Sequence, residues 1–302
     1  MEKLSHIDKY VGLPAQYKSN ASAWEDYIGE LYAIGKEQLP GEQEKTEREI
    51  VLIKFAKDAV DEVLKKYGKR EIYDVPLDHI HVFEKGGVEK FTEQRLGSGA
   101  HSTTRGTVLA DRSDSEVYFS TVLFHELCHA KKYNAVQIIP ANKSKTEKAE
   151  IENYREGIII TSRDGKQRYF ENFEEAIEGL LTQRFYEEKI KTSELFKEEV
   201  SRIKNEQRKI NTSRPKELED LNRIINYIYE QNKTEFKTRN DVVDVFVEAS
   251  VNGDLFRLAR LVEKTFGKGS FRELGKGTGS NNKESDKNKQ TDMFDEEINE
   301  NN

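Results

Sequence analysis

Residues 121–130 read TVLFHELCHA and contain the pattern His-Glu-x-x-His. The apolar residues around the pattern are typical of a buried helix, on which residues four positions apart lie on the same face. His125 and His129 can therefore point both imidazoles at one ion, and Glu126 is placed to hold a metal-bound water and take its proton. The stretch predicts a zinc site, whereas two incidental core histidines would be the structural alternative.

The composition limits the class of protein. The chain has 302 residues, enough for one large domain or two small ones, and its formal net charge of −7 argues against a general nucleic-acid binder. The first 17 residues contain no apolar core of signal-peptide length, and no stretch approaches the length of a membrane span. We expect a cytoplasmic protein with no nucleic-acid or membrane partner.

The single cysteine, Cys128, lies inside the histidine pattern. One cysteine permits no internal disulfide, which fits a reducing compartment. Its spacing from His125 and His129 puts it off the face that they share, so we expect a buried structural thiol and no metal ligand.

Apolar periodicity divides the chain into four regions. We expect helices in 1–70, around Trp24 to Ile34 and Ile50 to Leu64, and a mixed core in 71–190. Region 191–274 returns to helix. Residues 275–302 contain almost no apolar side chains and form a tail that cannot bury enough surface to become ordered.

The mixed core combines strand and helix patterns. We expect a strand over 79–83, a loop over 97–101, a strand over 103–110, a β-hairpin over 156–170 with an Asp-Gly turn, and a helix from about Asn172. His79 and His81 alternate with apolar residues, which favours the solvated side of an edge strand over a metal pair. The strand over 103–110 is a natural edge for docking an extended peptide.

A catalytic zinc usually has three protein ligands and one water. No further histidine follows at the spacing of the HExxHxxGxxH pattern, so the third ligand is expected to be an acid on a second helix. Residues 173–179 read FEEAIEG and offer Glu174, Glu175 and Glu178. These acids could also form a solvated face near a helix N-terminus, where acids are common.

Together these motifs resemble small zinc metallopeptidases of the minigluzincin kind, whose catalytic core is related to those of thermolysin and anthrax lethal factor. The resemblance covers roughly 72–188. In that family the second helix reads Leu-Asn-Glu-Ala-x-Thr-Glu, and its first Glu is the third ligand, which corresponds to Glu175 here. The family's second acid falls on Gly179, so Glu174 as ligand with Glu178 behind it stays open.

The resemblance implies an α+β fold with a zincin-like core, in which a small mixed or antiparallel sheet carries the metal helix and the Glu helix. It also implies hydrolysis of peptide bonds, with Glu126 as general base and then proton donor. Related enzymes often add a Tyr or His from outside the motif as oxyanion donor, for which Tyr169 and His101 are the nearest candidates. A regulatory protein that binds a partner through its helical regions, and a zinc hydrolase of non-peptide amides, are the alternatives.

Overall fold

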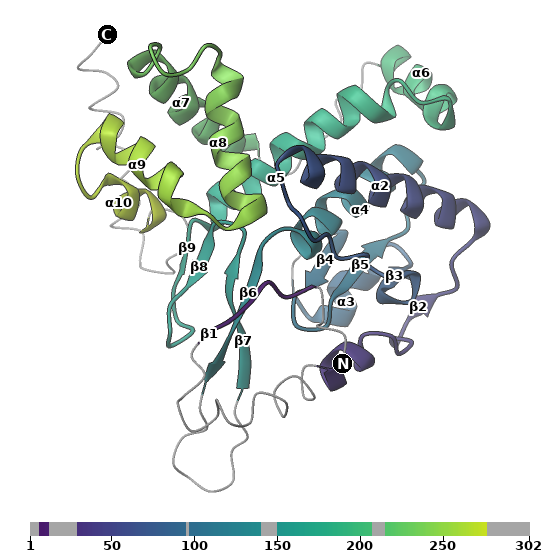
Figure 1. The fold of residues 1–302 in the computed structure, drawn as a ribbon. Coiled ribbons are helices and arrows are strands. Elements are labelled where there is room, and N and C mark those ends of the chain that lie inside the picture. The colour runs from purple at the N-terminus through teal and green to yellow at the C-terminus, as the bar shows by residue number, and fades with distance from the viewer. Residues whose placement is uncertain (1–5, 12–28, 95–96, 140–149, 207–214, 277–302) are drawn as a thin grey trace, which may run out of the picture.

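The computed structural model describes residues 6–11, 29–94, 97–139, 150–206 and 215–276, and these form a mixed α+β fold with two sheets (Figure 1). Of the helix expected from Trp24 to Ile34, residues 29–34 are helical and the earlier part lies outside the described residues, as does nearly all of the expected tail. No helix within these ranges is both long and apolar enough to cross a membrane.

The smaller sheet has the order β2-β3-β5-β4, with bounds of Glu42–Gln43, Ile80–Phe83, Thr107–Asp111 and Gly99–Ser102. β3 and β5 are parallel, and the other neighbours are antiparallel. One face packs against helices α2 (Glu47–Lys66) and α4 (Glu116–Lys131), and the other against α3 (Gly87–Thr92). The sheet therefore separates a large core from a small one.

Two expectations for this sheet were wrong. The segment 97–101, expected as a loop, contributes most of strand β4, which pairs with β5 in an antiparallel hairpin. β4 is therefore the edge of the sheet, whereas the strand expected over 103–110, which corresponds to β5, is an inner strand. His79, in the short helix η2 (Leu77–His79), is buried against Tyr32, and His81, on the inner strand β3, is buried between Glu42 and the Gly35 carbonyl. Sequence alternation alone could not distinguish an inner strand carrying buried histidines from a solvated edge.

The larger sheet has the order β1-β6-β7-β8-β9, with bounds of Lys9–Val11, Asn134–Ile139, Glu150–Glu156, Ile159–Thr161 and Arg168–Tyr169. β1 runs parallel to β6, and the other neighbours are antiparallel. The hairpin expected around the Asp-Gly turn is confirmed as β8 and β9, with Gly165 at φ +71°. This sheet extends from the body of the molecule as a blade between the two groups of helices (Figure 1).

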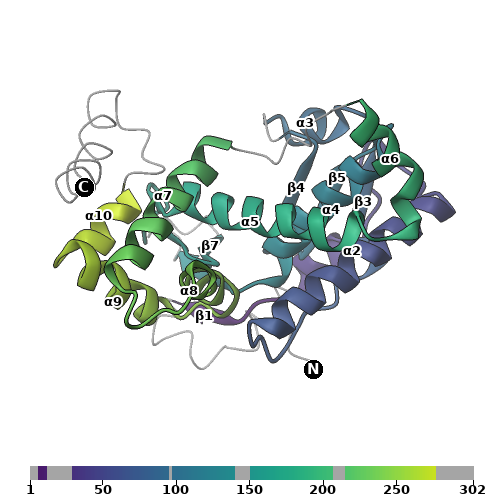
Figure 2. The same ribbon diagram turned by 90° about the horizontal axis from the view of Figure 1, so that it is seen from above.

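The expected helices are present. α4 begins at Ser115, whose hydroxyl accepts from the Tyr118 amide, and α5 (Glu171–Phe185) continues into a π-turn, η3 (Tyr186–Ile190). After η4 (Glu194–Phe196) come α6 (Lys197–Asn205), α7 (Pro215–Gln231), α8 (Arg239–Asn252), α9 (Leu255–Phe266) and α10 (Ser270–Lys276). Seen from above, α5 crosses the middle of the molecule between α7–α10 and the side formed by α2 and α4 (Figure 2).

Buried apolar residues from α2, α4, α5 and α7–α10 belong to one continuous cluster. The cluster includes residues from three of the regions expected from the sequence, and α5 links them. The side chains of the candidate site lie on α4, α5 and the strands beside them, so they project from elements that are packed into this cluster.

Candidate metal centre

Three side chains converge where α4 meets α5. The Nε2 atoms of His125 and His129 are 3.1 Å apart, and Glu175 places one carboxylate oxygen 3.5 Å from the first and the other 3.7 Å from the second. His129 is buried, while His125 and Glu175 retain a little exposure, so the group has a buried side and an open side.

These separations are the ones that a metal ion requires. Four ligands at about 2.0–2.1 Å in a tetrahedron lie roughly 3.3 Å from one another. The three donor atoms are already near that spacing, and all lie within 4.8 Å of one another. The group formed by His125, His129 and Glu175 can therefore hold a metal ion.

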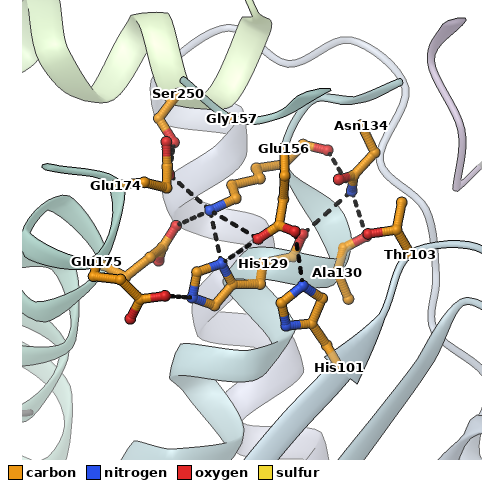
Figure 3. Close-up of polar contacts among 12 residues, drawn as sticks. His101, Thr103, His129, Ala130, Asn134, Glu156, Gly157, Glu174, Glu175 and Ser250 are labelled. Carbon is orange, nitrogen blue, oxygen red and sulfur yellow. Dashed lines mark hydrogen bonds and ion pairs between the residues drawn. The ribbon is translucent and has the colours of Figure 1, made fainter. Parts of the chain in front are cut away.

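The neighbouring acids point elsewhere. Glu174 is fully buried and accepts from Lys132 Nζ at 2.7 Å, from the Ile158 amide at 2.6 Å and from Ser250 Oγ at 2.5 Å (Figure 3). Glu178 contacts the same Lys132 at 3.1 Å. The structure thus brings Glu175 to the histidines and uses Glu174 and Glu178 in a buried ion cluster behind them.

Glu126 is held by a histidine from the edge strand. His101, on β4, contacts Glu126 through Nδ1 at 3.2 Å and Glu156 through Nε2 at 3.1 Å. Burial disfavours a charged His101, but the carboxylates of Glu156 and Glu126 outweigh it and raise its pKa to about 10. Burial also works against a charged Glu126, yet its hydrogen bond to His101 and the nearby site histidines lower its pKa. Glu126 is therefore a carboxylate at neutral pH.

Glycine makes this contact possible. A Cβ atom on Gly99 would lie 2.8 Å from Glu126 Cγ and 2.7 Å from Val122 Cγ1. Real Cβ atoms do not approach that closely, so a side chain here would push β4 away from α4. The sequence places the small residue where the strand must pass next to the expected base.

A second group of possible ligands lies on the other side of His129. His101, His129 and Glu156 also have atoms within 4.8 Å of one another. However, Lys132 Nζ lies 2.8 Å from His129 Nδ1, and an ammonium at that position repels a divalent ion. The first group is therefore the better metal site of the two that the described residues form.

An open cleft of about 470 Å³ leads to the first group. Glu126, His101 and the three converging residues line it, together with β4 and side chains that include Tyr118, Arg168 and Tyr186. Tyr169 is outside the lining formed by the described residues, and its hydroxyl donates to Gln167. Of the two oxyanion candidates from the sequence, the structure thus brings His101 to the site and leaves Tyr169 on β9.

The charge around the site is strongly acidic. Five carboxylates, those of Glu126, Glu156, Glu174, Glu175 and Glu178, accompany two cations, the ammonium of Lys132 and the imidazolium of His101. Such an excess of buried negative charge is costly without a cation. Cys128 is buried beside this cluster as expected, and burial, with Glu178 nearby, raises the pKa of its thiol well above the usual range.

Sequence reasoning missed Lys132 and the contacts of Glu156. Lys132 appeared to mark the polar end of α4, but its side chain is 1% exposed. Burial opposes its charge, while Glu174, Glu178 and Glu156 raise the pKa of Lys132 far above the usual value. The available signal was a lysine at the end of an apolar helix, matched by acids set among apolar residues in 156–160 and 173–181.

Comparison with known proteins identifies no relative: no family model, no curated protein and no solved structure matches the chain. Inferences about function therefore rest on the geometry above.

Proposed function

We propose that the protein is a zinc-dependent peptidase whose metal ligands are His125, His129 and Glu175. The observation that carries the proposal is the convergence of two imidazole nitrogens and a carboxylate at ligand spacing, at the bottom of an open cleft. Two imidazoles and one carboxylate, with a fourth position left for water, are the donor set of a hydrolytic zinc.

Bound zinc would supply a water of lowered pKa and polarise the scissile carbonyl. The carboxylate of Glu126 would act as the general base, taking a proton from the attacking water and later donating it to the leaving amine. The lowered pKa of Glu126 keeps it ionised for the first of these steps, and His101 holds it in position through Nδ1.

The developing oxyanion needs a donor, and Tyr186 is our candidate. It is the first residue of η3, directly after the end of α5, and it lines the cleft. Burial raises the pKa of Tyr186, so its hydroxyl keeps its proton and can donate. Tyr169, the candidate from the sequence, would have to exchange its bond to Gln167 for such a role.

The proposed substrate is a peptide or an extended segment of a protein. β4 pairs with β5 on one side, and the described residues contribute no strand to its other side. All but the last of its residues line the cleft, so an extended chain can pair with its backbone and pass across Glu126. This is the docking that we expected for the strand before α4, moved to the true edge of the sheet.

The test combines metal content with peptide cleavage. We expect about one zinc per chain by mass spectrometry, and cleavage of a mixed peptide library that stops when a chelator is added. Glu126→Gln should retain the zinc and lose activity by roughly 10²–10⁴-fold, the contribution of a general base. Glu171→Gln, which changes another acid of the same cleft, is the matched control and should retain both.

The contrary outcomes are distinct. A protein that takes up no zinc after refolding with the metal would contradict the proposal and favour a helical binding protein. Zinc uptake with equal activity in wild type and Glu126→Gln would leave a metal site but remove the proposed base.

A further inference from the structure

The imidazole of His129 has contacts that conflict. Its Nδ1 lies 2.8 Å from Oε1 of Glu156 and also 2.8 Å from Nζ of Lys132 (Figure 3). A carboxylate can only accept a hydrogen bond, and an ammonium can only donate one. A neutral imidazole carries one N–H, so Nδ1 can satisfy one of these neighbours but not both.

The choice decides whether His129 can bind a metal. If Nδ1 accepts from Lys132, the hydrogen is on Nε2, which then points a donor at His125 and Glu175. If Nδ1 donates to Glu156, the lone pair of Nε2 is free and faces the site. Only the second tautomer can ligate through Nε2.

We propose that Glu156 is a positioning residue that selects the metal-binding tautomer of His129, and that Glu174 and Glu178 support it by offering the Lys132 ammonium acceptors in place of Nδ1. The inference rests on the proposed metal function. It gives the two unused acids of α5 a defined role, as anchors for a cation that would otherwise favour the wrong tautomer.

Glu156 is well fixed for this role. Its side chain is 4% exposed, and its second oxygen contacts His101 Nε2 at 3.1 Å. The rings of His101 and His129 are stacked, with centroids 4.7 Å apart and planes within 3° of parallel. One carboxylate therefore joins the edges of two parallel imidazoles, and turning it away would break both contacts.

Lys132 is equally constrained from the other side. Glu174, which anchors it, is itself held by the Ile158 amide and by Ser250. Gly157, at φ +55°, leaves the space that the Glu174 carboxylate occupies, since a Cβ atom there would lie 2.4 Å from its oxygen. The ammonium has three protons, and Glu174, Glu178 and Glu156 offer an acceptor for each, at 2.7, 3.1 and 3.9 Å. A small shift toward Glu156 would therefore satisfy Lys132 without His129.

The first measurement reads the tautomer in the metal-free protein. In the nitrogen-15 NMR spectrum of the histidine side chains at mildly alkaline pH, we expect His129 of the wild type to carry its proton on Nδ1. In Glu156→Leu the remaining neighbour of Nδ1 is Lys132, so the proton should move to Nε2. Glu152→Gln, on the same strand, is the matched control and should leave the spectrum of His129 unchanged.

The second measurement is zinc affinity, by competition with a chromogenic chelator. We expect Glu156→Leu to bind zinc about 10–100-fold more weakly, as for other partners of ligating histidines. Glu156→Asp, which retains an acceptor, should recover part of the loss. Thermal unfolding of the metal-free variants shows whether each one folds, and Glu156→Met, which is close in volume and has no oxygen acceptor, replaces Glu156→Leu if that variant does not fold.

The outcomes separate the two proposals. If the wild type binds no zinc, the proposed function fails, while the NMR comparison still tests Glu156. If the wild type binds zinc and the Glu156 variants keep both its affinity and its tautomer, the role of Glu156 is overturned and the metal site stands.

Discussion

The chain has six histidines, and five of them form two groups with opposite electrostatics. His101, His125 and His129 contact carboxylates, and the pKa values of the first two are raised against the effect of burial. His6 and His79 are also buried, but His6 stacks on Tyr32 and packs on Tyr73, and His79 packs on Tyr32. Burial lowers the pKa of His6 to about 4 and also lowers that of His79. The sixth, His81, contacts Glu42 at 2.8 Å and belongs to neither group.

Burial alone therefore does not define a histidine site. Desolvation acts in the same direction on both groups, and the carboxylates reverse its effect in one of them. A metal centre is recognised here by its acids as much as by its histidines. Replacing one histidine, or one charged neighbour of a histidine, at a time therefore tests this contrast.

The largest effect is expected from removing the cation among the acids. Lys132→Met would leave Glu174 and Glu178 buried with no opposite charge, at a cost of roughly 3–5 kcal/mol in the free energy of unfolding. Urea unfolding of the metal-free protein measures it. Lys166→Met, at a largely exposed lysine, should change little, and equal costs for the two variants would contradict the ion cluster.

The next effect concerns the third ligand. Glu175→Gln should weaken zinc binding by more than the roughly 10–100-fold typical of groups behind a ligand. The stability of the metal-free protein should change little, because Glu175 borders the open cleft. Chelator competition and thermal unfolding measure the two quantities. Unchanged affinity in Glu175→Gln would exclude it as the ligand.

The two groups should also give opposite pH dependence in the metal-free protein. His6 has a folded pKa of about 4, below its unfolded value of about 6.5, so the unfolded state binds the proton first. Stability should fall as pH drops from about 6.5 toward 4, by up to about 3 kcal/mol. Replacing the ring with a similar apolar one, in His6→Phe, should remove this slope.

His101 behaves in the other sense. Its folded pKa of about 10 lies above the unfolded value, so its contribution is full below about pH 6.5 and is lost as pH rises toward 10. Unfolding curves of wild type and His101→Gln across this range test the sign. We expect the stability of His101→Gln to depend less on pH than that of the wild type over this range. If the variant instead loses stability more steeply as pH rises, the raised pKa of His101 is contradicted.

The smallest effect is expected at His79 in η2. His79 contacts the Gly106 carbonyl and belongs to neither group of possible ligands among the described residues. His79→Gln should leave zinc content and zinc affinity unchanged in the same competition assay. Loss of zinc from a folded His79→Gln protein would mean that the two histidine groups are not independent.

The part of the site that could be predicted from sequence is the part set by short-range spacing. The interval between His125 and His129 fixes their common face on α4, and the helix carrying Glu175 follows from its own periodicity. The choice between Glu174 and Glu175 depends on the rotation of α5 against α4, which only the packed structure supplies.

In the fold, too, the elements set by short-range patterns could be predicted and those set by long-range pairing could not. Helices α2 and α4–α9 and the hairpin of β8 and β9 arise from local patterns and were expected. Strand β4 was missed because its residues, Gly-Ala-His-Ser, have little strand preference, and pairing with β5 determines it. Glu156 and Lys132 were missed because their partners are distant in sequence. The division into four regions remains a prediction.

The hydrogen bond from Ser250 to Glu174 makes the ion cluster depend on the C-terminal helices. Ser250 lies on α8, far along the sequence from the histidine pattern, yet it caps the acid that holds Lys132. A fragment ending after η3 would keep every proposed metal ligand. It would also open the ion cluster and the apolar face of α5 to water. Cleavage of the chain between α5 and α8 followed by loss of the C-terminal piece should therefore abolish the proposed activity without altering any of the proposed metal ligands.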